Sequence, residues 1–165
     1  MESKEKTENK ERILGKAKDL FMQYGIRSIT MDEIAGQLGI SKKTIYQFFT
    51  DKDEMVEAVV MEEIMENEAG CRQFQVDAEN AVHEIFLAME NVQEMMKTMN
   101  PQLMYDLEKH HPGAFRRLKQ YKYQFLFTMI RTNLDRGMKE GSYRKDLNPD
   151  IACRNRIESV FMAFK

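Results

Sequence analysis

The sequence has few residues that interrupt helices, with three prolines and eight glycines among 165 residues. Long helices are therefore permitted. No run reaches about 18 apolar residues, so we expect no transmembrane helix. Cys71 and Cys153 lie far apart and outside any metal-binding pattern, which favours two free thiols in a reducing cytoplasm over the alternative of a disulfide. The N-terminal stretch MESKEKTENKER is charged and has no apolar core, so we expect no secretory signal peptide.

Common catalytic patterns are also absent from the sequence. It contains no Ser-His-Asp order, no glycine-rich phosphate loop and no His-Glu-x-x-His. Asp106, Glu108 and His110 could be combined into an acid–base site, but nothing places them in a cleft. The adjacent His110 and His111 would point in different directions on a helix, and no Cys or His cluster completes a metal site. We therefore expect no enzyme, no metal and no cofactor.

Charge is distributed unevenly along the chain, although the net charge is only −2. Residues 1–52 carry a net charge of +2, residues 53–100 carry −10 and residues 101–165 carry +6. A nucleic-acid-binding protein needs a basic face rather than a basic total, and the first segment is the candidate. The acidic run 53–68 is expected to be a solvated face that could also repel DNA. A later basic run is expected to be solvated too, with pairing to the acidic run or binding of an anionic ligand as alternatives: Arg116, Arg117, Lys119 and Lys122.

Apolar residues recur at helical spacing through most of the chain, and no long strand-like alternation occurs. The first helix is expected over residues 9–24, with Gly25 as a left-handed C-terminal cap. Thr30 begins a second helix, and Glu33 three residues later completes a capping box. Gly39 ends that helix.

Ser41 is expected to cap a third helix over residues 42–49. Asp51 or Thr50 would then cap a fourth, acidic helix from about residue 52 towards residue 71. Turn-forming pairs such as Asn100-Pro101 separate the later segments. The remaining helices are expected at roughly 76–98, 102–110, 113–137 and 150–165. The sequence therefore predicts an all-α protein.

Residues 31–50 have the pattern of a helix-turn-helix. Ala35 is the small residue needed where two short helices cross, and Gly39, four residues later, tolerates the positive φ of the turn. Apolar residues from both helices, from the turn and from the first helix would fill a three-helix core: Ile34, Leu38, Ile40, Ile45, Phe48, Leu14, Ala17 and Phe21.

The polar side of the third helix carries side chains suited to DNA. Lysine can donate to guanine, and Gln47 can pair bidentately with adenine. Thr44 and Tyr46 suit phosphate oxygens, as do the amides at helix N-termini. A solvated amphipathic helix is the alternative for each residue alone, but their combination on a helix-turn-helix favours DNA binding. The expected DNA-binding residues are Thr30, Ser41, Lys42, Lys43, Thr44, Tyr46, Gln47 and Lys52.

The segment SITMDEIAGQLGISKKTIYQFFTDKDEM, residues 28–55, resembles the DNA-binding domain of the tetracycline-repressor (TetR) family. The resemblance extends back to Phe21 and Gly25 and covers about the first third of the chain, and residues 136–150 are similar to the loop that often precedes helix 8 of the family. The residues that carry it in segment 28–55 are Thr30, Ile34, Ala35, Gly39, Ile40, Ser41, Thr44, Ile45, Tyr46, Phe49 and Lys52.

The resemblance implies a homodimeric repressor that binds a palindromic operator in double-stranded DNA. The positions of Thr44, Tyr46 and Lys52 usually contact phosphates in such proteins. The position of Lys43 is often a glycine, so base contacts cannot be copied from the family. Gln47 occupies a variable position and is the leading candidate for a base contact.

The second part of the chain is rich in methionine, a flexible side chain that suits an adaptable apolar pocket. Ordinary helical core is the alternative for each methionine. The family resemblance implies an unidentified small-molecule effector. Four residues could supply polar contacts to a ligand: Tyr105, Asp106, His110 and His111. The candidate pocket residues are Met65, Phe86, Met89, Met104, Tyr105, Tyr123 and Phe127.

These patterns together predict a DNA-binding domain over residues 1–52 and a helical ligand-binding and dimerisation domain over residues 53–165, with the fourth helix as connector. Family members usually end with two long helices that form a bundle with the partner subunit, so we expect the C-terminal end shown here to be incomplete. The expected function is a cytoplasmic, ligand-responsive transcriptional repressor. The alternatives are a helical small-molecule carrier without DNA binding, a transcriptional activator of the same fold, and a helical enzyme, for which no catalytic constellation is found.

Overall fold

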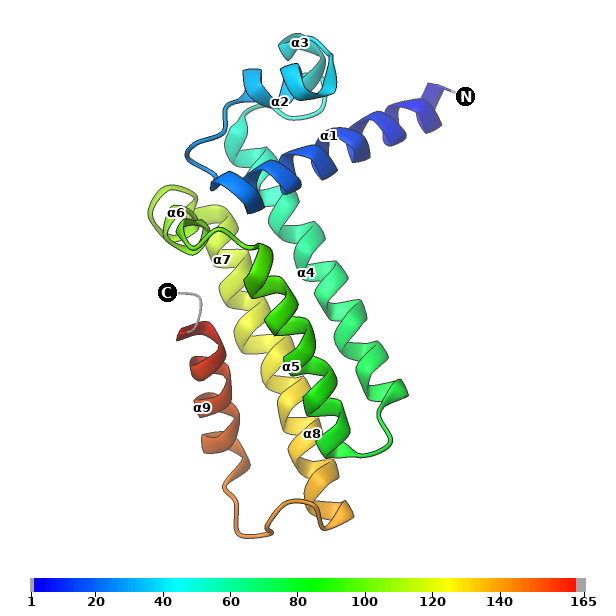
Figure 1. The fold of residues 1–165 in the computed structure, drawn as a ribbon, viewed down its shortest axis with the longest axis vertical. Coiled ribbons are helices and arrows are strands. Elements are labelled where there is room, and N and C mark those ends of the chain that lie inside the picture. The colour runs from blue at the N-terminus through cyan, green and yellow to red at the C-terminus, as the bar shows by residue number, and fades with distance from the viewer. Residues whose placement is uncertain (1, 163–165) are drawn as a thin grey trace. The chain divides into compact units, whose positions relative to one another are not determined.

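The computed structural model describes residues 2–162, and every regular element in this range is helical, which confirms the all-α prediction (Figure 1). The order is α1 (Glu2–Tyr24), α2 (Met31–Leu38), α3 (Lys42–Ile45), α4 (Lys52–Asp77), α5 (Ala81–Thr98), α6 (Gln102–His110), α7 (Pro112–Tyr121), a π-helical turn (Lys122–Leu126), α8 (Phe127–Glu140) and α9 (Pro149–Met162). No described helix is both long and apolar enough to cross a membrane.

The helices pack as two compact units. The first contains the residues up to Glu63 together with Thr98–Arg117, and the second contains Ile64–Lys97 and the residues from Leu118 onward. α4 and α7 each contribute to both units. This division differs from the expected boundary at residue 52, because the start of α4 and all of α6 pack with the first three helices. The functional domain boundary itself stays a prediction.

The core of the first unit is built from α1, α2 and α3 as the helix-turn-helix pattern predicts. Its fully buried side chains come from each of these helices and from the residues that follow α3: Ile13, Ala17, Phe21, Ile34, Ala35, Ile45 and Phe49. Four of the expected core residues, Leu14, Leu38, Ile40 and Phe48, are only half-buried. Phe49, which is 1% exposed, takes the inner position instead of Phe48.

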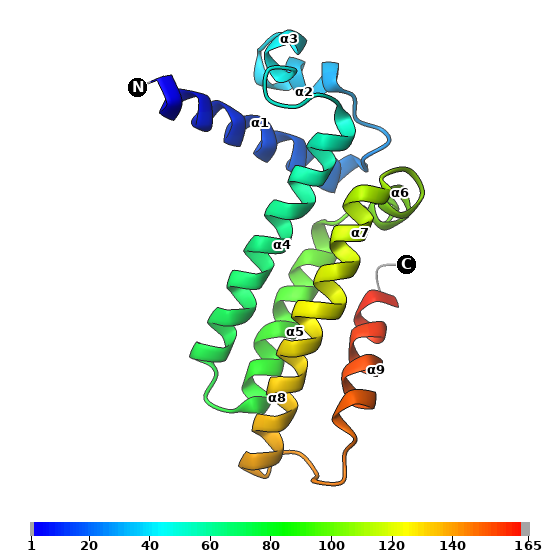
Figure 2. The same ribbon diagram turned by 180° about the vertical axis from the view of Figure 1, so that it is seen from behind.

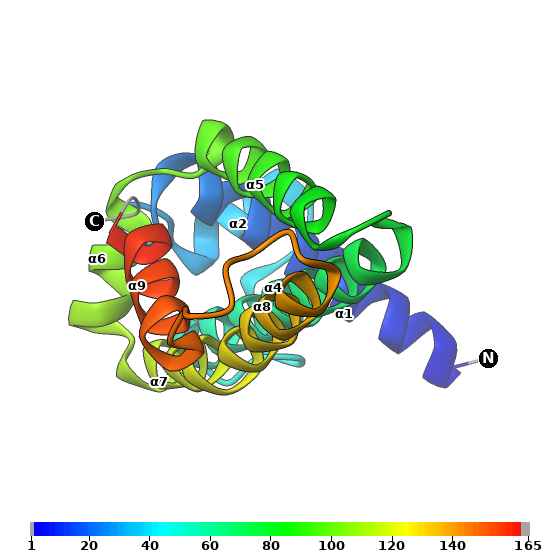
Figure 3. The ribbon, with the colours of Figure 1, turned by 90° about the horizontal axis from the view of Figure 1, so that it is seen from below.

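In the second unit, α9 runs back along α8 after the connection at residues 141–148 (Figure 2). Figure 3 views α5, α8 and α9 nearly end-on. Asn133 on α8 donates its side-chain amide to the carbonyl of Ala81 at the start of α5, with a distance of 2.9 Å. Arg136, one turn further on, lies 3.5 Å from the carboxylate of the buried Glu84. Arg131 on α8 pairs with Asp150 on α9. Polar contacts thus tie α8 to both neighbours.

Several helix boundaries differ from those expected. α4 continues to Asp77 because nothing in its sequence stops it before Ala78. α5 begins at Ala81 rather than near residue 76, because Asn80 caps it by accepting the N–H of His83 at 2.9 Å. The single helix expected over 113–137 is instead α7, the π-helical turn and α8, which together reach Glu140.

Candidate nucleic-acid interface

α2 is closed at its N-terminus by the expected capping box. The N–H of Glu33 donates to the hydroxyl oxygen of Thr30 at 3.2 Å, and the Glu33 carboxylate accepts the Thr30 N–H at 2.6 Å. The hydrogen bond from the Thr30 N–H, followed by that from the Thr30 hydroxyl at 2.8 Å, lowers the pKa of the Glu33 carboxyl. Since the pKa in the folded protein is lowered, the cap stabilises the fold above the ordinary glutamate pKa and is lost as the pH falls through the lowered value.

The turn between α2 and α3 has the expected left-handed glycine. Gly39 has φ +65°, a conformation that favours glycine, and its N–H bonds to the carbonyl of Gly36 at 3.2 Å. Arg12 on α1 donates to the carbonyl of Leu38 at 3.1 Å and so satisfies one of the carbonyl groups at the end of α2. α1 therefore supports the turn directly, which sequence spacing did not indicate.

α3 is shorter than expected. Ser41 caps it as predicted, because its hydroxyl accepts the N–H of Thr44 at 3.1 Å. Regular α-helix ends at Ile45 rather than Phe49, and the chain then tightens into bonds between residues three apart, such as Phe48 N–H to Ile45 carbonyl at 2.9 Å. Tyr46 and Gln47 consequently lie in a turn that follows α3.

The polar face of α3 and this turn is exposed as predicted. Lys43 and Gln47 are exposed, Tyr46 is 45% exposed and Thr44 is half-buried. Ile45, which is 0% exposed, fixes the opposite side in the core. The side chains available to a partner are therefore held on a packed scaffold.

Two of the lysines expected to contact DNA have protein partners. The ammonium of Lys42 lies 2.7 Å from the Asp32 carboxylate, and this hydrogen bond raises the pKa of Lys42. The ammonium of Lys52 donates to the carbonyl of Ile26 at 2.5 Å and lies 5.9 Å from the centre of the Phe21 ring. Burial lowers the pKa of Lys52. The Lys52 ammonium thus has partners within the first unit, and its contact with a phosphate stays a prediction.

The candidate pocket residues fall into different places. Met104 and Tyr105 belong to α6 in the first unit, whereas the other five belong to the second unit. Exposed side chains make up most of the set: Met65, Phe86, Met89, Tyr105 and Tyr123. Tyr123 and Phe127 lie together around one pocket.

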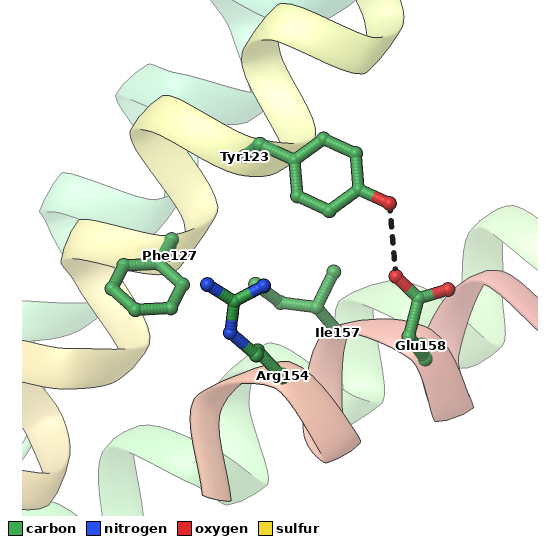
Figure 4. A pocket seen from close by; sticks show the side chains of 5 residues that line it. All are labelled: Tyr123, Phe127, Arg154, Ile157 and Glu158. Carbon is green, nitrogen blue, oxygen red and sulfur yellow. Dashed lines mark hydrogen bonds between the residues drawn. The ribbon is translucent and has the colours of Figure 1, made fainter. Parts of the chain in front are cut away.

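That pocket has a volume of about 340 Å³ and is completed by three residues of α9: Arg154, Ile157 and Glu158 (Figure 4). The Glu158 carboxylate accepts the Tyr123 hydroxyl at 3.0 Å and the ammonium of the buried Lys122 at 2.9 Å. Sequence analysis missed Arg154 and Glu158, because no pattern linked α9 to the start of α8.

Two of the polar residues considered as ligand contacts, Asp106 on α6 and His111 directly after it, are engaged with other parts of the first unit. Asp106, which is buried, accepts the N–H of Arg27 at 2.9 Å. His111, also buried, lies 2.6 Å from the carboxylate of Asp53 through its Nδ1 atom. No group of three or more potential metal ligands gathers within the described part of the chain. Asp106 and His111 therefore have partners within the first unit, and their contact with a ligand stays a prediction.

Known proteins match this chain in sequence and in fold. Residues 13–59 match the model of the family described as bacterial regulatory proteins, tetR family. The HTH-type transcriptional regulator YvaF of Bacillus subtilis is 28% identical over 151 residues, which cover 90% of this chain and 77% of that protein. An HTH-type transcriptional regulator of Staphylococcus aureus strain USA300 is 36% identical over 61 residues, 37% of this chain and 33% of its own length.

Solved structures extend the likeness of the fold beyond the helix-turn-helix. A TetR-family transcriptional regulator from Agrobacterium tumefaciens has a TM-score of 0.79 at 16% identity, covering 96% of this chain and 83% of that one. Reduced NemR of E. coli has a TM-score of 0.80 at 12% identity, and the match covers 95% of this chain and 85% of NemR. Together with the matched helix-turn-helix and its exposed polar face, these findings confirm the family indicated by the sequence. Residues 13–59 thus form a DNA-binding domain of the tetR family of bacterial regulatory proteins, a family of transcriptional regulators and not of enzymes, and the similarity to YvaF extends over most of the chain.

Proposed function

We propose that this protein is a ligand-responsive repressor that binds a palindromic operator as a homodimer. The observation that carries the proposal is the exposed polar surface of α3 and its turn, held by the buried Ile45. A carrier without DNA binding would have no use for this surface. The proposed cellular location is the cytoplasm, where the operator would be accessible.

The proposed contacts divide into those that position the protein and those that select sequence. Lys43 would contact base edges in the major groove from near the N-terminus of α3, where a recognition helix reads bases. Gln47 would contact base edges from the exposed turn that follows α3. The remaining expected residues would bind phosphates or the edge of the groove: Thr30, Ser41, Lys42, Thr44, Tyr46 and Lys52. Lys42 would first exchange its Asp32 partner for DNA.

A homodimer would place two recognition helices about 34–36 Å apart, one turn of DNA. An effector that binds the second unit better in one state would shift α4 and change this spacing. Tyr123 and Phe127 are the favoured ligand contacts, because both line the pocket of Figure 4.

Fluorescence anisotropy tests the proposal with DNA from upstream of the protein's own gene, at two salt concentrations, and with random DNA as the control. We expect salt-sensitive binding that is tighter to the upstream DNA. A full-length dimer that binds neither DNA would favour the carrier. A transcription assay then separates repression from activation, which binding alone does not distinguish.

Replacement of Gln47 with alanine is expected to relax sequence preference at one position in each half-site, by roughly 1–3 kcal/mol. Tyr46→Ala is the matched contrast, because loss of a phosphate contact should weaken binding to all sequences similarly. Selection of binding sites from a random pool measures both effects. An unchanged preference for Gln47→Ala would remove this residue from the base contacts.

A further inference from the structure

The end of α1 is capped by residues far away in the sequence. A helix leaves its last carbonyl groups without partners inside the helix. Gly25, at φ +82°, satisfies the carbonyl of Phe21 through its N–H at 2.9 Å. Asn100 satisfies the next two carbonyl groups of α1. Its backbone N–H donates to the carbonyl of Met22 at 2.7 Å, and its side-chain amide donates to the carbonyl of Gln23 at 3.3 Å.

The turn after α1 is also held by distant residues, Asp106 and Lys52. The Arg27 N–H donates to the carboxylate of Asp106, which is 3% exposed. Lys52 donates to the carbonyl of Ile26, one residue earlier, and Asp106 favours the charged form of Lys52 against the effect of burial. A Cβ atom at Gly25 would lie 3.5 Å from the Asp106 carboxylate, so the two parts fit closely.

The other end of α6 is attached to α4. His111, the residue after α6, lies 2.6 Å from Asp53 in the first turn of α4. α6 therefore bridges two elements: through Asn100 and Asp106 it holds the end of α1, and through His111 it holds the start of α4. The segment Thr98–Arg117 that contains this bridge is joined to the second unit by the chain at both of its ends.

We propose that Asn100 and Asp106 are positioning residues for DNA recognition. α1 supplies Phe21 and Ala17 to the core beneath α3 and supports the end of α2 through Arg12. Fixing the end of α1 therefore fixes the angle at which α3 is presented relative to α4. Release of the bridge leaves the helix-turn-helix folded but no longer oriented for two half-sites. The inference rests on the proposed DNA binding through α3.

The test uses duplexes selected from a random pool by the wild-type protein, with random DNA as the second probe. Asp106→Ala removes the acceptor, whereas Asp106→Asn keeps an oxygen for the Arg27 N–H. In the wild type, the side-chain oxygen of Asn100 accepts the Gln102 N–H at 2.8 Å. Asn100→Asp keeps this acceptor but replaces the amide group that donates to the carbonyl of Gln23. Glu108→Ala is the control, because this exposed carboxylate lies on the same helix. Circular dichroism measures the unfolding of each variant, and the assay temperature is chosen where the variants are folded.

We expect Asp106→Ala and Asn100→Asp to weaken binding to the selected DNA by about tenfold, the effect of one lost hydrogen bond of typical strength. Binding to random DNA should change less than about twofold, and Asp106→Asn should recover most of the loss. A purely structural role would lower the unfolding temperature and leave the ratio of the two affinities unchanged.

The outcomes separate this inference from the function on which it rests. A wild-type protein without any sequence preference would overturn both the proposed function and the inference. A wild-type preference that survives in folded Asp106→Ala and Asn100→Asp would overturn the inference alone. If Asp106→Ala does not fold, Asn100→Asp decides, because this substitution replaces the donor to the carbonyl of Gln23 and keeps the acceptor for the Gln102 N–H.

Discussion

Replacement of Phe21 with alanine is expected to lower the free energy of unfolding of the first unit by about 3–5 kcal/mol. The Phe21 side chain is 1% exposed and closes the core formed by α1, α2 and α3. Its removal leaves a cavity as large as the ring, and the ring also lies 5.9 Å from the Lys52 ammonium. This loss is a large part of the stability of a typical domain, so DNA binding should fall with it.

Urea unfolding followed by circular dichroism measures the effect, and Phe21→Leu is the matched variant. Leucine keeps an apolar side chain in the core and should cost much less than alanine. DNA binding should recover in Phe21→Ala at low temperature to the extent that the unit is folded. A loss below about 1 kcal/mol would show that the ring is not part of a tightly packed core.

The features that the sequence predicts correctly are the local ones. The capping box of Thr30 and Glu33, the cap by Ser41 and the left-handed Gly39 each depend on residues within a few positions of one another. The predicted helix boundaries are less accurate. Regular α3 ends early because the chain tightens after Ile45, although its periodicity continues.

The long-range contacts of the first unit could not be predicted from one sequence. Asn100 and Gln23 are 77 residues apart, and Arg27 and Asp106 are 79 apart. Such pairs depend on packing, and no spacing rule links them. Lys52 illustrates the consequence: the hydrogen bond from its ammonium to the carbonyl of Ile26 could not be foreseen from its residue type and position, and its contact with a phosphate stays a prediction.

The pocket residues were the least predictable part of the site. Methionine and aromatic residues at helical spacing usually belong to the core but also occur on surfaces, so composition did not separate Phe127 from the exposed Phe86 and Met89. What places Tyr123 and Phe127 at one pocket is the return of α9 along α8. That arrangement depends on the length of the connection at residues 141–148 and on tertiary packing.

Replacement of Gly137 with alanine is expected to destabilise the second unit by about 1–3 kcal/mol, because the added methyl group meets a packed ring. Gly137 is buried on α8, and a Cβ atom there would lie 2.2 Å from the ring of Tyr143. The Tyr143 hydroxyl lies 3.1 Å from both the carbonyl oxygen of Ala81 and the side-chain oxygen of Asn133, and its one proton is shared between these two acceptors. Displacing the ring therefore breaks the contacts that hold α5 to the end of α8.

Thermal unfolding tests this prediction, with an expected fall of about 2–4 °C for each kcal/mol in a chain of this size. Gly15→Ala is the control, because nothing lies within 4 Å of a Cβ atom at that position of α1. It should stabilise α1 by roughly 0.5–1 kcal/mol, the usual gain from replacing a glycine within a helix. In a Tyr143→Ala background, Gly137→Ala should lose its cost, since the clash needs both side chains. A full cost in that background would show that the strain at Gly137 comes from the helix itself and not from Tyr143.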